Sequence, residues 1–377
     1  MIKKKLKIIH IITGLNNGGA EGVLYRLCKY DLANEHVVIS LTTDGKYGSM
    51  LRDIGVNVIC LHLKSFSSIL PSLINLYKII KKEKPYIVQT WMYHADLIGG
   101  IIARLAGVKK IYWNIRQTNL IKGKSKKTTI LIAKICSKIS SFIPYKIICC
   151  ANEAKKTHVD LGYKDENMVV IPNGFDFSQY ENLHHNEIKE QLGIPQSSIC
   201  IGMVARFDPQ KNHFLLLDAF EKIYKNRNIK LILIGSNITN NNKILVEYIK
   251  KKNIEQETIL LGERKDIPEI MSLLDIHILS SSFGEGFPNV LVEAMASETP
   301  CIATDVGDSS LIISDCGWII PPNNLDKLVS ALNSALSIIE LDNKKWKDIC
   351  MACKRHVTSN YDIKKMIDTY NSTWFEK

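Results

Sequence analysis

The chain has 377 residues, 46% of them hydrophobic, which is long enough for two ordinary domains with complete cores. No charge-free run reaches the roughly 18 residues that a membrane-spanning helix needs, so the sequence indicates no such span. Most of the ten cysteines lie in apolar segments, as reduced core residues do. Cys350 and Cys353 form a C-x-x-C without a second pair or a nearby histidine cluster, which favours ordinary thiols over zinc or redox chemistry.

The N-terminal segment resembles a signal peptide, because lysines precede an apolar run. That run lacks an A-x-A-like cleavage site and passes into the glycine-rich turn GLNNGGAEG, so we interpret KIIHIIT as the first strand. A helix is predicted from about 20 to 30. The glycines allow the backbone to approach a ligand closely, but the turn is not G-x-G-x-x-G, so a nicotinamide dinucleotide fingerprint is absent.

Strand-like runs and helical patterns alternate along the rest of the first half. The predicted strands are HVVISLTT, VNVICLHL, YIVQTWM, KKIYWNIR, YKIICCA and MVVIPNG, and the predicted helices fall near 69–84, 95–107, 127–142 and 152–162. This alternation predicts a parallel sheet covered on both faces.

The pattern lapses between residues 175 and 198, which are polar and contain proline, and this segment is the best candidate for a linker. The alternation then resumes. It gives ICIGMVARF, helix 212–227, IKLILIGS, helix 241–253, TILLGER, helix 266–274, DIHILSS, helix 288–297, CIATD and GWIIP, followed by closing helices. The sequence therefore predicts an α/β protein with two Rossmann-like, doubly wound parallel-sheet domains. We place them at 1–175 and 176–360, facing each other across a ligand-binding cleft.

The stretch from Ser280 to Pro300 carries the strongest single motif. A strand end leads through a glycine-bearing loop into a helix that we expect to begin at Pro288, because proline suits a first helical position. Free N–H groups and the helix dipole make this helix start an anion site, which Glu285 and Glu293 flank. A sugar nucleotide has a central phosphate and hydroxyl-rich ends, and it fits such a site. The alternative is a solvated loop charge beside an ordinary helix start.

Other polar residues and glycines also follow predicted strands. They are Gly18, Gly19, Glu21, His94, Asn173, Gly174, Arg206, Lys211 and Arg264. Each has an ordinary explanation alone, as a turn, a helix-terminal residue or a solvated cation. Because ligands of open α/β sheets bind at the carboxyl ends of the strands, their shared placement indicates a binding site.

Four motifs together resemble those of retaining glycosyltransferases of family four: GLNNGGAEG, IPNGFD, VARFDPQKN and FGEGFPNVLVEAMA. They occur in the expected order, and the resemblance spans essentially the whole chain. It implies the B-type glycosyltransferase fold, in which the final helix, here 361–377, crosses back onto the N-terminal domain. The chain departs from the family at Gly22, where arginine is frequent, and at Ala205, where glycine is frequent.

The resemblance also implies site roles. Arg206 and Lys211 would bind the donor diphosphate and stabilise the charge on the leaving nucleotide, Glu285 would bind donor-sugar hydroxyls, and Glu293 would accept hydrogen bonds from the ribose. His94 matches a histidine near the transferred sugar. The remaining donor-binding candidates are the N–H groups of Phe287, Asn289 and Val290, the loop of Gly18 and Gly19 closing over the diphosphate, Asn173, and the backbone around Arg264 for the base.

No D-x-D motif occurs, so we expect no metal and no cofactor besides the donor. The resemblance implies transfer with retained anomeric configuration from a nucleotide sugar, with UDP the commonest carrier in this family. For a bacterial-type enzyme the expected acceptor is a lipid-linked oligosaccharide of O-antigen or capsule synthesis. The expected location is cytoplasmic, peripheral on the inner face of the cytoplasmic membrane.

The positive charge is concentrated in one half of the chain. Residues 1–175 carry 27 Lys and Arg against 11 Asp and Glu, whereas residues 176–377 carry 22 against 27. The lysines gather in two amphipathic stretches, at Lys78, Lys81, Lys82 and Lys84 and at Lys122, Lys124, Lys126, Lys127, Lys134 and Lys138. This pattern favours an anionic membrane surface over a merely solvated one. Nucleic acid is disfavoured, because interleaved aromatics and a binding module are lacking.

Two other functions compete with a glycosyltransferase. One is a sugar-nucleotide epimerase of the same two-domain shape, which would need neither a basic half nor the E-x7-E motif. The other is a non-catalytic nucleotide-sugar binding protein, against which the intact set of Arg206, Lys211, Glu285 and Glu293 argues.

Overall fold

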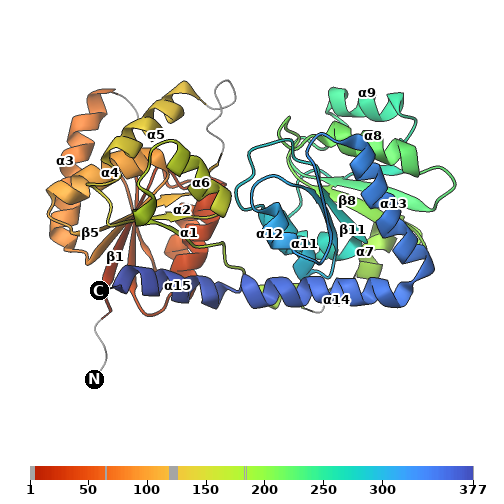
Figure 1. The fold of residues 1–377 in the computed structure, drawn as a ribbon. Helices are drawn as coiled ribbons and strands as arrows, with labels where there is room; N and C mark the ends of the chain where they lie inside the picture. The colour runs from red at the N-terminus through yellow and green to blue at the C-terminus, as the bar shows by residue number, and fades with distance from the viewer. Residues whose placement is uncertain (1–4, 64–65, 119–125, 182, 184, 377) are drawn as a thin grey trace. The chain divides into compact units, whose positions relative to one another are not determined.

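The computed structural model describes residues 5–63, 66–118, 126–181, 183 and 185–376. The chain forms two compact units. The first unit comprises residues 1–174 together with 363–377, and the second comprises 175–362 (Figure 1).

The first unit is built on a seven-stranded parallel sheet with the strand order β3-β2-β1-β4-β5-β6-β7. Its strands are β1 (Lys7–Ile12), β2 (Glu35–Ser40), β3 (Asn57–Cys60), β4 (Ile87–Trp91), β5 (Lys110–Ile115), β6 (Lys146–Cys149) and β7 (Met168–Val170). The central strands are almost wholly buried runs of β-branched and aromatic residues, as sheets covered on both faces require. The strand order reverses direction between β1 and β4, which places a topological switch point there.

Helices cover both faces of this sheet. They are α1 (Gly19–Tyr30), α2 (Gly45–Asp53), α3 (Phe66–Glu83), α4 (Tyr93–Leu105), α5 (Lys127–Ile139) and α6 (Asn152–Asp160). Helix α4 packs against both α3 and α5, whereas α1 packs against α2 and against the C-terminal helix α15 (Ile363–Phe375) (Figure 1). The helices α3, α4 and α5 therefore form one continuous outer layer.

The second unit repeats this architecture with a six-stranded parallel sheet of order β10-β9-β8-β11-β12-β13. Its strands are β8 (Ile199–Val204), β9 (Ile229–Ile234), β10 (Thr258–Leu260), β11 (Ile276–Leu279), β12 (Cys301–Thr304) and β13 (Trp318–Ile320). Its helices are α7 (His185–Gln191), α8 (His213–Ile223), α9 (Lys243–Lys251), α10 (Ile267–Leu273), α11 (Asn289–Ala296), α12 (Ser309–Ile313), α13 (Leu325–Leu341) and α14 (Asn343–Asn360). The predicted fold class, two doubly wound parallel-sheet domains, is confirmed.

Buried polar contacts fix α15 on the first sheet. The Trp374 indole Nε1 donates to Gln89 Oε1 at 2.8 Å, and Asn114 Nδ2 donates to the Tyr370 hydroxyl at 2.7 Å. Tyr370 and Trp374 are completely buried. Gly174 faces the same helix, and a Cβ there would lie 2.7 Å from Met366 Cβ, so the close approach of α15 requires glycine at 174.

The linker predicted at 175–198 is wrong. This segment contains the 3-10 helix Phe177–Tyr180 and α7, and it contributes the buried side chains Tyr180, Ile188 and Ile194 to the core of the second unit. The reason is that short helices need few apolar residues to anchor them, so the surrounding polar residues conceal the pattern.

Two further differences concern helices. The sequence analysis missed α2, whose segment contains two glycines and little apolar periodicity. Pro288 is the N-cap of α11 rather than its first helical residue, with φ −73° and ψ 95°, and the helix begins at Asn289. Among the described residues, no helix is both long and apolar enough to cross a membrane.

Candidate functional site

An ion pair between Lys211 and Glu285 lies at the carboxyl edge of the second sheet. Lys211 Nζ is 2.6 Å from Glu285 Oε1, and the two side chains are only 13% and 9% exposed. Ser281 Oγ donates to the same carboxylate oxygen at 2.5 Å. Lys211 follows β8 and Glu285 follows β11, the adjacent strand, so the sheet brings together two predicted site residues that are distant in the sequence.

The loops that carry this ion pair are packed onto one another. Ser280 Oγ donates to the carbonyl oxygens of Lys211 and Asn212, at 3.0 and 3.1 Å. Gly307, after β12, has φ +65°, and a Cβ there would lie 2.5 Å from the Glu285 carbonyl oxygen. Backbone contacts from two neighbouring strand ends thus hold Glu285 in place, which is the kind of support that a preorganised site needs.

Arg206 is more exposed than the ion pair. Its side chain is 57% exposed, its Nε lies 3.4 Å from Asp208 Oδ2, and one terminal nitrogen donates to Gln210 Oε1 at 3.1 Å. Exposed pairs of this kind contribute little to stability, so the guanidinium can exchange these partners for a ligand at small cost.

The start of α11 carries four of the predicted donor contacts. Asn289 and Val290 are its first residues, and first-turn N–H groups have no partner within a helix. Glu293 is half-buried one turn later. The Phe287 ring packs edge-on against Tyr361 with centroids 5.2 Å apart, so this side chain serves the core of its own unit and leaves ligand contact to the backbone.

Arg264 lies apart from these residues. It follows β10, the edge strand, with β9 between β10 and β8. Its Nε donates to Asp266 Oδ1 at 2.9 Å, and the guanidinium holds the pKa of Asp266 below its usual range. The second sheet therefore groups Lys211 with Glu285 and places Arg264 further along the same edge.

The first unit has a cavity of about 240 Å³ at its switch point. It is lined by Ile12, Thr13, Gly14, Ala20, Glu21, Met92, Tyr93, His94, Gln117 and Thr129. These residues come from the carboxyl ends of β1, β4 and β5 and from the starts of α1, α4 and α5. The predicted histidine, His94, thus lies where an open α/β sheet binds its ligand.

Among the groups that line the cavity, His94 and Glu21 have shifted pKa values that bear on what the cavity can bind. Burial, and secondarily the charge of Lys126, lowers the pKa of His94 below its usual value, so the imidazole is neutral at pH 7. Burial raises the pKa of Glu21. A neutral imidazole beside a partly desolvated carboxyl group can hydrogen-bond hydroxyls, which suits a sugar better than an anion.

The backbone that leads to His94 is held in an unusual conformation. Met92 has φ 72° and ψ 156°, a region that residues other than glycine rarely adopt, and its N–H donates to the Asn114 carbonyl at 3.0 Å. Burial lowers the pKa of His158 to about 4, so the ring is neutral. Its Nδ1 donates to the Ala154 carbonyl at 2.6 Å, so its Nε2, 2.7 Å from the Tyr93 hydroxyl, accepts from it. The start of α4 is therefore fixed next to His94.

The glycines of the first loop have separate roles. Gly18 is the N-cap of α1, and a Cβ there would lie 2.4 Å from Glu21 Oε2. A Cβ on Gly19 would meet nothing within 4 Å. A side chain at the cap position would therefore displace the Glu21 carboxylate, whereas the first helical residue leaves open space above the helix start.

Residues 184–347 match the family model described as glycosyl transferases group 1, and residues 17–179 match the one described as Glycosyltransferase Family 4. The chain belongs to glycosyltransferase family 4. Its fold matches that of Alr3699/HepE from Anabaena, crystallised in complex with UDP, with a TM-score of 0.86 at 21% identity over 98% of this chain and 99% of that one. The B-type glycosyltransferase fold expected from the motifs is thereby confirmed.

Two curated relatives of this glycosyltransferase act in bacterial glycan synthesis by name. The Escherichia coli UDP-Gal:alpha-D-GlcNAc-diphosphoundecaprenol alpha-1,3-galactosyltransferase is 28% identical over 313 residues, 81% of this chain and 79% of the relative. The Staphylococcus aureus capsular polysaccharide biosynthesis glycosyltransferase CapM is 25% identical over 345 residues, 89% and 82% of the two chains.

The glycosyltransferase also has a contact that the sequence analysis missed. Asn173 is buried, and its Oδ1 accepts a hydrogen bond from the guanidinium of Arg116. The Nε and the other terminal nitrogen of Arg116 are buried without a partner among the described residues. The guanidinium carbon of Arg116 lies 5.9 Å from the centre of a Trp91 ring. Arg116 could have been found in the sequence, because it stands at the end of the predicted strand KKIYWNIR, and His94 was selected for the same kind of position.

One set of side chains in the described part of the chain is close enough to hold a metal ion: His10, Cys28 and His36, all buried. Their hydrogen bonds indicate a different role. The Trp91 indole Nε1 donates to His10 Nδ1 at 3.3 Å, so His10 Nε2 carries the proton that points to His36 Nδ1, 3.0 Å away. His36 Nε2 then lies 3.2 Å from Asp31 Oδ2. The two ring nitrogens that face each other, His10 Nε2 and His36 Nδ1, are therefore already joined by a hydrogen bond. These three side chains do not fit a metal ion, because neither nitrogen is available as a ligand.

Proposed function

We propose that this glycosyltransferase transfers a hexose or N-acetylhexosamine from UDP to a lipid-linked oligosaccharide, with retention of the anomeric configuration, in O-antigen or capsule synthesis. The observation that carries the proposal is the desolvated Lys211–Glu285 pair at the carboxyl edge of the second sheet. It offers an ammonium for a phosphate and a carboxylate for sugar hydroxyls within one hydrogen bond of each other.

The nature of the donor is supported by the relatives. HepE was crystallised with UDP, and the name of the Escherichia coli enzyme states a UDP-sugar donor. In this chain, Lys211, Arg206 and the N–H groups at the start of α11 would neutralise the diphosphate, since charge-assisted hydrogen bonds stabilise the charge that develops on the leaving group. Glu293 would then accept from the ribose hydroxyls, and the backbone near Arg264 would contact the base.

The acceptor would enter from the cavity of the first unit. The name of the Escherichia coli relative states an acceptor bearing a diphosphoundecaprenol, and we extend that class of acceptor to this chain. The proposed location is the inner face of the cytoplasmic membrane, where such lipids are accessible to a peripheral enzyme. Neutral His94 would bind a hydroxyl near the anomeric carbon, and the loop of Gly18 and Gly19, with Asn173, would line the donor side.

The proposed reaction occurs on one face of the sugar. The acceptor hydroxyl forms a bond to the anomeric carbon as the bond from that carbon to the phosphate oxygen breaks, and the departing phosphate oxygen takes the hydroxyl proton. The described residues supply cations and a helix start for the diphosphate, so we propose that the step needs no metal.

The test combines ligand binding with product analysis. Thermal unfolding is measured with a panel of nucleotides and nucleotide sugars, and a UDP-sugar at about 100 times its dissociation constant should stabilise the protein by about 2.7 kcal/mol. The stabilising donor is then incubated with a polyprenyl-diphosphate glycan, and the anomeric configuration of the product is determined by NMR. Stabilisation by no UDP-sugar, or an epimerised donor in place of a glycan product, would overturn the proposal.

A further inference from the structure

The outer layer of the first unit exposes apolar side chains in two regular stripes. On α3 the stripe consists of Leu70, Ile74 and Tyr77, followed by Lys81, and every member is exposed. Their spacing of four, three and four residues places them along one side of the helix. The opposite side carries Ser72, Leu76 and Ile80, which are buried against the first unit.

Helix α5 and the turn after it repeat the arrangement. Leu131, Ile135, Lys138 and Phe142 have the same four-three-four spacing, and all are exposed, Phe142 to 75%. The buried residues of α5 lie on the other side of the helix, at Ala133, Cys136 and Ser137. A surface helix normally has one apolar face, directed to the core. Both α3 and α5 have a second apolar stripe that faces solvent.

The two stripes belong to one surface. Helix α4 packs against both α3 and α5, and all three cover the same face of the sheet (Figure 1). The middle of α4 adds Leu97, Ile98, Ile101 and Ile102, which are partly exposed. We call this surface, made of the two stripes and α4, the apolar layer.

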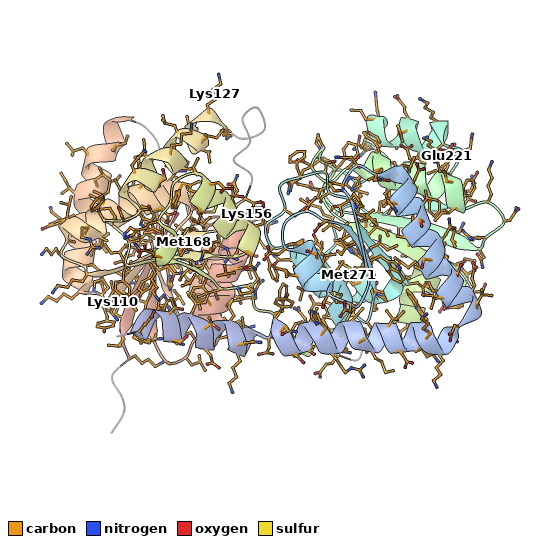
Figure 2. The ribbon with its side chains drawn as sticks, viewed as in Figure 1. Lys110, Lys127, Lys156, Met168, Glu221 and Met271 are labelled. Atoms are coloured by element: carbon orange, nitrogen blue, oxygen red, sulfur yellow. The ribbon has the colours of Figure 1, made fainter. Side chains whose placement is uncertain are left out.

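Positive charge surrounds the apolar layer. Residues 66–146 contain 15 Lys and Arg and two carboxylates, Glu83 and Asp96, of which Asp96 is buried and Glu83 is bonded to Lys7. Lys78, Lys81 and Lys82 on α3 and Lys127, Lys134 and Lys138 on α5 are exposed. Figure 2 shows Lys127 projecting outward at the start of α5.

We infer that the apolar layer docks on an anionic lipid bilayer, with Leu70, Ile74, Leu131, Ile135 and Phe142 entering the interface and the lysines contacting lipid headgroups. The inference rests on the proposed function, because it places the enzyme on the surface that holds a lipid-linked acceptor. Apolar insertion and cationic attraction together are what interfacial helices use to bind membranes.

Other occupants fit less well. A second copy of the chain would bring two strongly basic surfaces together, and like charges repel. Single-stranded nucleic acid binds to aromatic side chains on which its bases stack, whereas four of the five side chains proposed to enter the interface are aliphatic. An acidic protein remains as an outcome of the test.

The experiment is co-sedimentation of the full chain with vesicles of phosphatidylcholine alone or with about 30% phosphatidylglycerol. Binding should be at least about tenfold tighter to the anionic vesicles and should weaken with salt. The double variant L70E/L131E should lose at least about tenfold in vesicle affinity. The matched control L311E/L341E adds the same charge at two exposed leucines of the second unit and should bind like the wild type.

A second pair separates the contribution of charge. K134Q/K138Q should weaken binding to anionic vesicles, whereas K344Q/K345Q, at two exposed lysines of α14, should not. The insertion of the stripes would be refuted if L70E/L131E and its control L311E/L341E lost the same vesicle affinity. It would also be refuted if only K134Q/K138Q lost affinity. Failure of the wild type to bind vesicles would overturn lipid as the occupant and leave an acidic protein.

Thermal stabilisation by the UDP-sugar is measured in parallel on all variants. It should be unchanged, because none of the substituted residues lies at the donor site. Vesicle binding without UDP-sugar stabilisation would refute the proposed function and leave the docking surface standing. The reverse result would refute the docking surface alone.

Discussion

The two carboxyl edges of this protein differ sharply although the sheets behind them are wound alike. The edge of the second sheet concentrates charge, with Lys211 and Glu285 paired at 2.6 Å and Arg206 exposed nearby in the sequence. The edge of the first sheet has a cavity whose histidine is neutral. One architecture therefore presents an ion pair at the edge in one unit and a cavity with a neutral imidazole in the other, which is the division that the proposed donor diphosphate and acceptor sugar would require.

The largest expected effect comes from removing the charge of the second edge. We predict that Lys211→Met lowers the transfer rate by about a thousandfold, because the leaving diphosphate loses its cation. It should also reduce the free energy of unfolding by about 3 kcal/mol, since the buried Glu285 carboxylate loses its cation and keeps only hydrogen-bond donors such as Ser281. Lys222→Met, at an exposed lysine 3.4 Å from Asp326, is the control and should change neither quantity much.

The double variant K211M/E285Q distinguishes a catalytic pair from a structural one. Urea unfolding should show that it recovers most of the lost stability, because no buried charge remains. Transfer should stay as low as in Lys211→Met. Recovery of both stability and transfer would mean that the ion pair serves only to hold its loops together.

The next largest effect is expected at His94, in the cavity of the first unit. His94→Gln should lower kcat by about a hundredfold, the usual contribution of a positioned hydrogen-bonding or acid–base group. Because burial lowers the pKa of His94, kcat of the wild type should be constant near pH 7 and fall only below about pH 6.5. A pH–rate profile of both proteins checks this, and an unchanged low-pH limb in the variant would contradict it.

Buried histidines in both units predict the pH dependence of stability. The pKa is lowered to about 4 in His158, to about 4 in His213 and to about 3 in His277, in each case mainly by burial. The unfolded chain takes up these protons near pH 6.5 and the folded chain does not, so the free energy of unfolding falls as the pH drops from 6.5 towards 4. Each histidine should contribute a slope of about 1.4 kcal/mol per pH unit.

Urea titrations of the wild type and of His158→Gln between pH 7 and pH 5 measure that slope. The variant should show a slope about 1.4 kcal/mol per pH unit smaller, whatever its stability at pH 7. Parallel curves for the two proteins would show that His158 is protonated in the folded state.

The smallest expected effect is that of metal removal. Chelation with EDTA or phenanthroline should leave both the transfer rate and the melting temperature unchanged, because the proposed reaction assigns the diphosphate to cations of the protein and the His10–His36 contact is a hydrogen bond. A fall in transfer alone would place a metal at the donor edge. A fall in melting temperature would indicate that His10, Cys28 and His36 bind a metal ion after all.

The sequence was sufficient for what repeats along the chain. Alternating strands and helices predicted both sheets, and placement after strand ends selected Lys211 and Glu285, which the structure then pairs. These signals are local, because periodicity and turns are written in neighbouring residues.

Contacts between distant residues could not be predicted in this way. The hydroxyl of Tyr93 finds His158 across 65 positions, and Arg116 finds Asn173 across 57. The lowered pKa of His94 depends on burial that no single segment specifies. The segment around Ile188 was wrongly predicted to be a linker for the same reason. Its few apolar residues are buried only because α7 packs against α10, which lies far along the chain.

The return of α15 to the first sheet bears on how the protein is made. During synthesis the strands of the first unit emerge early, but Tyr370 and Trp374, which fill its core, are translated only after the entire second unit. Until then the nascent first unit exposes the part of its apolar core that α15 covers. Ribosome-bound chains that stop short of residue 363 should therefore be substrates for chaperones, and the first unit should not be obtainable as an independent fragment without that helix supplied in trans.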